Sequence, residues 1–66
     1  MEGTASRAVT TAAALMVGWM RALQGRTEEA EHLLERALRG YQDINDSRGH
    51  ALALRRLHWV ALARGE

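Results

Sequence analysis

The sequence predicts an all-α fold, and three observations lead to it. Proline is absent from the 66 residues, and no stretch alternates β-branched with polar residues in the way that a half-buried strand requires. Apolar residues instead recur at spacings of three and four, which places them along one side of a helix. Glycine, asparagine, aspartate and serine stand at the points where such helices can end. We therefore expect one domain, residues 1–66, with helices over about residues 5–24, 28–44 and 47–64.

The first helix is predicted from an uncharged, alanine-rich stretch. Its apolar residues fall three or four apart: Ala8, Ala12, Leu15, Met16, Trp19, Met20 and Leu23. Thr4 or Ser6 can cap its start, because a hydroxyl accepts a bond from an unpaired backbone N–H. Gly25 can adopt the left-handed conformation that ends many helices. The uncharged stretch runs from Ala8 to Met20 and has thirteen residues. It is too short to span a bilayer, which needs about 20 apolar residues, so we expect a buried helix and not an exported or membrane segment.

The second helix is amphipathic. Thr27 is a suitable N-cap, and Glu28 and Glu29 place negative charge where the helix dipole favours it. The apolar side comprises Ala30, Leu33, Leu34, Ala37, Leu38, Tyr41 and Ile44. Gly40 lies inside this helix at a cost of roughly 1 kcal/mol relative to alanine. We expect the helix to continue past it, since Tyr41 and Ile44 extend the stripe.

The third helix begins after Asn45-Asp46-Ser47, three residues that favour caps and turns, with Asp46 or Ser47 as its N-cap. Its apolar residues occupy more than one side: Ala51, Leu52, Ala53, Leu54, Leu57, Trp59, Val60, Ala61, Leu62 and Ala63. Such a helix expects neighbours on two sides. Its own hairpin can fill only one of them.

The third helix also copies the first. A shift of 40 residues aligns identical residues in three pairs and similar ones in two more: Ala13 with Ala53, Trp19 with Trp59, Gly25 with Gly65, Val17 with Leu57, and Met20 with Val60. A fixed period of this length is typical of stacked helical repeats.

The spacing of small residues resembles that of the tetratricopeptide family. The positions that carry the resemblance are Gly18, Gly25, Ala30, Leu34, Ala37 and Leu38, and the series starts again at Leu57 and Gly65. The turn at Asp46-Ser47-Arg48-Gly49 resembles the longer-period repeats in sensor arrays of large bacterial transcription regulators. The resemblance covers residues 10–66 and implies antiparallel helical hairpins that bind protein. The chain departs from it at His58, which replaces the close-contact glycine, and in lacking the turn proline.

One and a half hairpins are fewer than the three or so repeats that such a stack usually needs. We therefore expect a homo-oligomer, a dimer in the simplest case, in which a second copy covers the third helix or exchanges it. The residues expected at that protein interface are Leu52, Leu57, Trp59 and Val60, with Trp19, Met16 and Met20. Those expected at repeat-packing positions are Gly18, Gly25, Ala30, Ala37 and Gly65.

No set of residues favours catalysis or metal binding. There is no cysteine, and His50 and His58 are two helical turns apart, too far to share one metal. The pair Glu29 and His32 has a spacing used in di-iron bundles, but such sites need further inward-facing glutamates. We expect no catalytic residue, no cofactor and no metal site.

Charge leaves one alternative open. The net charge is only +1, which argues against an overall field that attracts nucleic acid. The third helix nevertheless carries Arg48, Arg55, Arg56 and Arg64. The leading hypothesis is a non-catalytic protein-interaction module in the cytoplasm, binding itself and another protein or peptide. The alternative is a small helical DNA-binding regulator that uses the arginine-rich helix.

Overall fold

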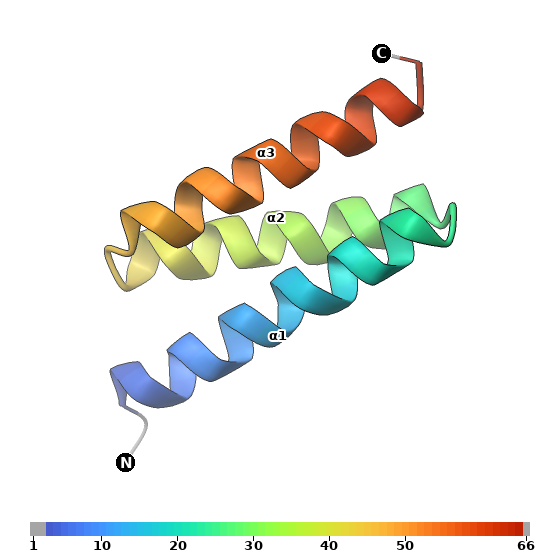
Figure 1. The fold of residues 1–66 in the computed structure, drawn as a ribbon. Coiled ribbons are helices and arrows are strands. Elements are labelled where there is room, and N and C mark those ends of the chain that lie inside the picture. Colours follow the sequence, from blue (N-terminus) through green and yellow to red (C-terminus); the bar gives the residue numbers. More distant parts are fainter. Residues whose placement is uncertain (1–2, 66) are drawn as a thin grey trace.

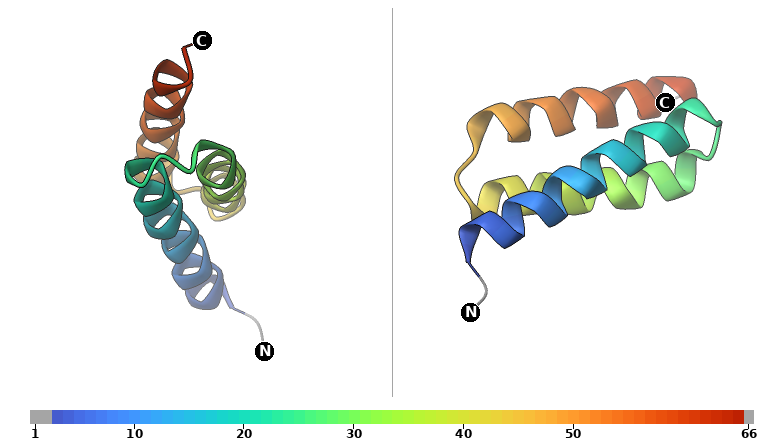
Figure 2. Two further views of the ribbon diagram at one scale, coloured as in Figure 1. Left: turned by 90° about the vertical axis from the view of Figure 1, so that its right-hand side faces the viewer. Right: turned by 60° about the horizontal axis from the view of Figure 1, so that its bottom comes forward.

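The computed structural model describes residues 3–65, which form three helices joined by two short turns (Figure 1). They are α1 (Thr4–Leu23), α2 (Thr27–Asp43) and α3 (Ser47–Ala63). Both α1 and α3 pack against α2 and meet each other at few points. Seen nearly end-on, α1 and α3 follow one another on one side and α2 lies beside them (Figure 2). The predicted all-α fold is confirmed.

The two turns share one hydrogen-bonding scheme. After α1, Gly25 has φ 82° and the Arg26 N–H donates to the Arg21 carbonyl at 2.9 Å, which is the Schellman pattern. After α2, Asn45 occupies the position equivalent to Gly25, with φ 57°. Gly65 follows α3 with φ 84°, so the ends of α1 and α3 correspond, as the 40-residue period predicts.

The helix starts differ from the prediction in two of three cases. Asp46 caps α3 as expected, because its carboxylate accepts a bond from the Gly49 N–H at 3.0 Å. The expected cap of α2, Thr27, is instead the first helical residue: the Schellman turn uses the Arg26 N–H, and Arg26 is the N-cap. The N-cap of α1 is Gly3, so Thr4, one of the two predicted caps, is instead the first helical residue, and Ser6 lies inside the helix.

The core lies along the contacts of α2 with both neighbours and is rich in alanine, which lets the helices come close. Its members are Ala14, Leu15, Ala22, Ala30, Leu34, Ala37, Tyr41, Ala53 and Val60. The apolar side predicted for α2 is confirmed. That of α1 is wrong in part: Met16, Met20 and Leu23 are exposed, and the side turned to α2 consists, apart from Leu15, of smaller residues. Since α1 is apolar on two sides, spacing alone did not decide which one α2 would cover.

Glycines within helices mark the closest approaches. A Cβ on Gly18 would lie 3.0 Å from Leu33 Cβ and Leu34 Cγ, so the predicted close contact at this position is confirmed. A Cβ on Gly40 would overlap the side chain of Thr11. Each helix of the first hairpin therefore contributes one glycine that admits a side chain of the other, which fixes how α1 crosses α2.

Candidate interaction surface

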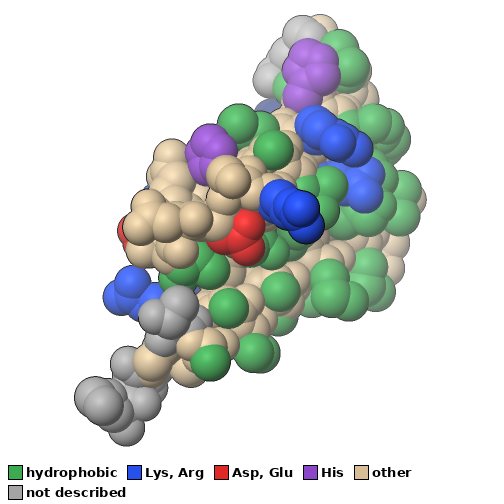
Figure 3. Space-filling view, turned by 60° about the vertical axis from the view of Figure 1, so that its left-hand side comes forward, with side chains coloured by type: hydrophobic (Ala, Val, Ile, Leu, Met, Phe, Trp, Pro, Cys, Tyr) green, Lys and Arg blue, Asp and Glu red, His purple; other side chains and the backbone are tan. Residues whose placement is uncertain are grey.

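The largest exposed apolar feature runs along the side of α1 that faces away from α2. We call it the outer stripe of α1, defined by Val9, Ala13, Met16, Met20 and Leu23. Val9, Met16, Met20 and Leu23 are 70%, 66%, 51% and 63% exposed, and Ala13 is exposed as well. Hydrophobic side chains are spread along the lower edge of the molecule in Figure 3. A contiguous apolar strip of this kind is typical of interaction sites.

The outer stripe of α1 corresponds to the packed side of α3. Under the 40-residue shift, Ala13 matches Ala53 and Met20 matches Val60. Ala53 and Val60 are 0% exposed because α3 rests on α2 through this side. The helices α1 and α3 therefore contact α2 through opposite sides. The side that α3 uses inside the chain is left open on α1.

A cluster of aromatic rings joins α1 to α3. The ring centres of Trp19 and Trp59 are 5.0 Å apart with an interplanar angle of 76°, an edge-to-face contact. The Arg56 guanidinium carbon lies 4.0 Å from the centre of the Trp19 ring, within the range of a cation–π interaction. The two tryptophans that the period aligns thus touch, and Trp59 remains 43% exposed.

The structure distributes the predicted interface residues over three environments. Met16, Met20 and Trp59 are exposed, and Trp19, Leu52 and Leu57 are half-buried. Val60 is completely enclosed by the chain itself. Val9 and Leu23 were not among the predicted interface residues. Their spacing of fourteen residues with Met16 midway was the signal that could have found them.

The outer side of α3 is less suited to another close helix. Leu54 and Leu62 are exposed here, where their equivalents on α1 are the buried Ala14 and Ala22. His58 stands at the position equivalent to Gly18. Because Gly18 has no room for a Cβ against α2, a histidine there holds an approaching helix farther away.

The distribution of charged residues differs between α2 and the layer formed by α1 and α3. Within their helical bounds, α1 and α3 contain no aspartate or glutamate, whereas α2 contains five: Glu28, Glu29, Glu31, Glu35 and Asp43. Ion pairs tie the start of α2 to both neighbours, from Arg21 to Glu29 at 3.2 Å and from Arg64 to Glu31 at 3.0 Å. With Arg56 on Trp19 and Arg64 on Glu31, two of the four arginines of the predicted basic helix have intramolecular partners.

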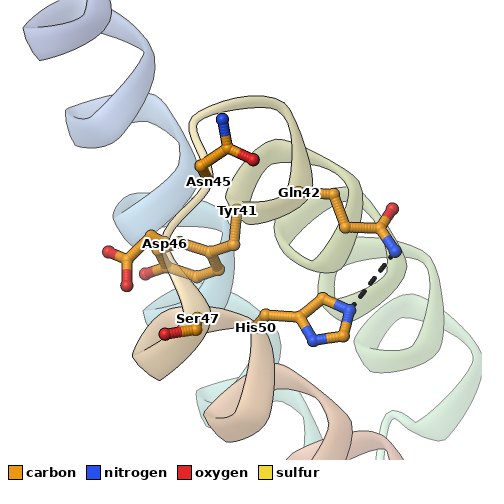
Figure 4. Close-up of a pocket in the computed structure, with 6 residues that line it drawn as sticks. All are labelled: Tyr41, Gln42, Asn45, Asp46, Ser47 and His50. Carbon is orange, nitrogen blue, oxygen red and sulfur yellow. Dashed lines mark hydrogen bonds between the residues drawn. The ribbon is translucent and has the colours of Figure 1, made fainter.

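A shallow hollow lies at the turn between α2 and α3 (Figure 4). Its lining residues are Tyr41, Gln42, Asn45, Asp46, Ser47 and His50. Gln42 Nε2 and His50 Nε2 are 3.3 Å apart, and Asp46 caps α3. Burial, and then the negative charge of Asp46, raise the pKa of Tyr41. These polar groups serve the turn, so we do not assign the hollow a ligand.

Comparison with protein-family models, curated proteins and solved structures finds no match for this chain. Over residues 3–65, no three histidine, cysteine or acidic side chains gather in a group that could hold a metal ion. In the same range, no helix combines the length and the hydropathy that a membrane crossing requires.

Proposed function

We propose that this chain is a protein-interaction module of the helical-repeat type, resembling tetratricopeptide repeats, which associates with itself and catalyses no reaction. The observation that carries the proposal is the outer stripe of α1. It is an apolar helix side, and among its equivalents on α3 the residues Ala53 and Val60 are completely buried within the chain. In a stack of helical repeats, each such side is covered by a neighbouring helix.

The size of the chain supports association. A compact monomer of 7.3 kDa exposes about 4,200 Å², whereas this chain exposes 4626 Å² and is elongated, 41 × 18 × 12 Å. A core of this size rarely supplies more than about 3–5 kcal/mol by itself. Covering the outer stripe of α1 adds stability that the single chain lacks.

The layer formed by α1 and α3 also offers a surface for a second kind of partner. It combines the exposed Trp59 with Arg48 and Arg55, and neither helix carries a carboxylate to oppose a negative charge. A protein segment with apolar anchors and acidic flanks is complementary to this surface, since large aromatic residues and arginines are frequent binding anchors.

Sedimentation equilibrium tests the proposal. Self-association gives a molar mass above 7.3 kDa that rises with concentration in the micromolar range. A chain that is helical by circular dichroism and monomeric throughout this range would refute it.

Duplex DNA is the second candidate, and the exposed Arg48 and Arg55 on a helix without acidic residues favour it. If the chain binds duplex DNA, binding should weaken steeply as the salt concentration rises, and Arg55→Ala should weaken it further. Binding that does not respond to salt, or no binding at low salt, eliminates this candidate.

A further inference from the structure

The outer stripe of α1 has the spacing of a coiled-coil seam. From Val9 to Leu23 its residues follow one another at intervals of four, three, four and three. A seven-residue repeat of this kind keeps the apolar seam turned toward a partner helix over its whole length. The stripe is therefore shaped for another helix that lies almost parallel or antiparallel to α1.

The stripe is complementary to itself when a second α1 runs in the opposite direction. One register pairs Ala13 with Met16 of the second copy and Val9 with Met20 of the second copy. In the same register Leu23 lies opposite Ser6. Each layer then combines a larger with a smaller residue, which fills the seam evenly. Parallel pairing would instead set Ala13 against Ala13 and Met16 against Met16, alternating thin and crowded layers.

No charge opposes this pairing. The residues that flank the stripe are uncharged: Thr10, Ala12, Val17, Trp19 and Gln24. Arg21 points toward α2, where it pairs with Glu29, and Arg7, fourteen residues earlier, falls on nearly the same side of the helix. A second α1 can therefore approach this side without meeting an arginine of α1, and the guanidinium of Arg56 from α3 lies against the ring of the flanking Trp19.

The area is sufficient for a small dimer. At the exposures given above, the stripe presents on the order of 500 Å² of apolar surface, a size at which patches often mark interaction sites. A two-fold pairing buries that stripe on each copy, about 1,000 Å² together, and the flanking Ala12 and Val17 bring the total toward the roughly 1,200–2,000 Å² of specific interfaces.

We infer that a second copy of this chain occupies the outer stripe of α1, with the two α1 helices antiparallel about a two-fold axis. The inference rests on the self-association proposed above and specifies its geometry. It differs in part from the expectation drawn from sequence, which centred the shared surface on the third helix and added Met16 and Met20 of the first. The contact is isologous, so it closes at two copies.

Disulfide cross-linking tests the register, and the chain has no cysteine of its own. Two variants, Val9→Cys and Met20→Cys, are mixed in equal amounts and oxidised. The pairing places these two positions in one layer, within disulfide reach. In a dimer of either variant alone, the two thiols lie about 16 Å apart along the helices. We expect a cross-linked dimer in the mixture and none in the separate samples. Cross-linking of either variant with itself, or none in a mixture that sediments as a dimer, overturns the inference.

A charge substitution tests the location of the contact. Met16→Glu places a carboxylate in the seam, whereas Leu62→Glu makes the same change at a residue of similar exposure on the outer side of α3. Because a buried unpaired charge is strongly unfavourable, Met16→Glu should weaken self-association by about a hundredfold or more, and Leu62→Glu by less than about threefold. Equal weakening, or a larger effect of Leu62→Glu, overturns the pairing through α1 and leaves the proposed self-association standing. A monomeric parent chain would overturn both.

Discussion

Replacing Gly40 with alanine should destabilise the fold, although alanine is the better helix former. Helix propensity alone favours the change by about 1 kcal/mol in a helix interior. In the structure, however, the new Cβ would overlap the side chain of Thr11, with Cγ2 only 2.8 Å away. Overpacking of a close helix contact costs about 1–3 kcal/mol. An overlap this deep takes the upper part of that range, about 2–3 kcal/mol, so after the gain in helix propensity we expect a net loss of about 1–2 kcal/mol.

A second substitution identifies the cause. Thr11→Ala removes Oγ1 and Cγ2 and leaves only Cβ at 3.0 Å, a contact that small shifts can relieve. In the double variant the crowding is largely gone and the gain in propensity remains, so the two changes should couple favourably by about 2 kcal/mol. The free energies are measured by urea unfolding followed by circular dichroism, at one fixed protein concentration. If Gly40→Ala is as stable as the parent, or if Thr11→Ala gives no relief, the crossing of α1 and α2 is not as described.

Three further predictions concern single residues. Tyr41 is the only tyrosine of the chain, which also lacks lysine and cysteine. Burial raises the pKa of Tyr41. The unfolded chain therefore loses the phenolic proton first, so stability should fall as pH rises above about 10 and level off beyond the folded pKa. Tyr41→Phe should abolish this fall in urea unfolding measured against pH. Asp46→Ala should cost about 1 kcal/mol by loss of the cap, whereas Ser47→Ala should change stability by less than about 0.5 kcal/mol, and equal effects would contradict the assigned cap. Gly25→Ala should cost about 1–2 kcal/mol because of its positive φ, and Gly25→Asn clearly less; equal losses would contradict the left-handed turn.

Most of the fold could be predicted from local features of the sequence. The asparagine-aspartate turn and the left-handed glycine after the first helix are short-range features, and both occur as expected. The amphipathic pattern of α2 has only one apolar side, so its buried residues could be predicted. The close contact at Gly18 was implied by the resemblance to tetratricopeptide repeats, and it is present.

The orientation of α1 could not be predicted in the same way. Both of its sides are apolar at helical spacing, and small residues such as Ala22 lie on the buried side while Met16 and Leu23 lie outside. Hydrophobicity favours burying the larger side chains, but two glycines bring α1 and α2 so close that, apart from Leu15, the buried side of α1 consists of small residues. From sequence, the open surface was therefore centred on the third helix, with Met16 and Met20 added from the first, whereas the structure places the larger uncovered stripe on α1.

The dependence of stability on protein concentration tests the central claim, that α1 is completed by a second copy. If folded chains pair and unfolded chains do not, raising the concentration a hundredfold stabilises the dimer by about 2.7 kcal/mol. With typical urea dependences, that shifts the unfolding midpoint upward by on the order of 1 M. The account predicts this shift for the parent chain and its absence in Met16→Glu. A midpoint that is the same at every concentration for the parent chain would contradict the account.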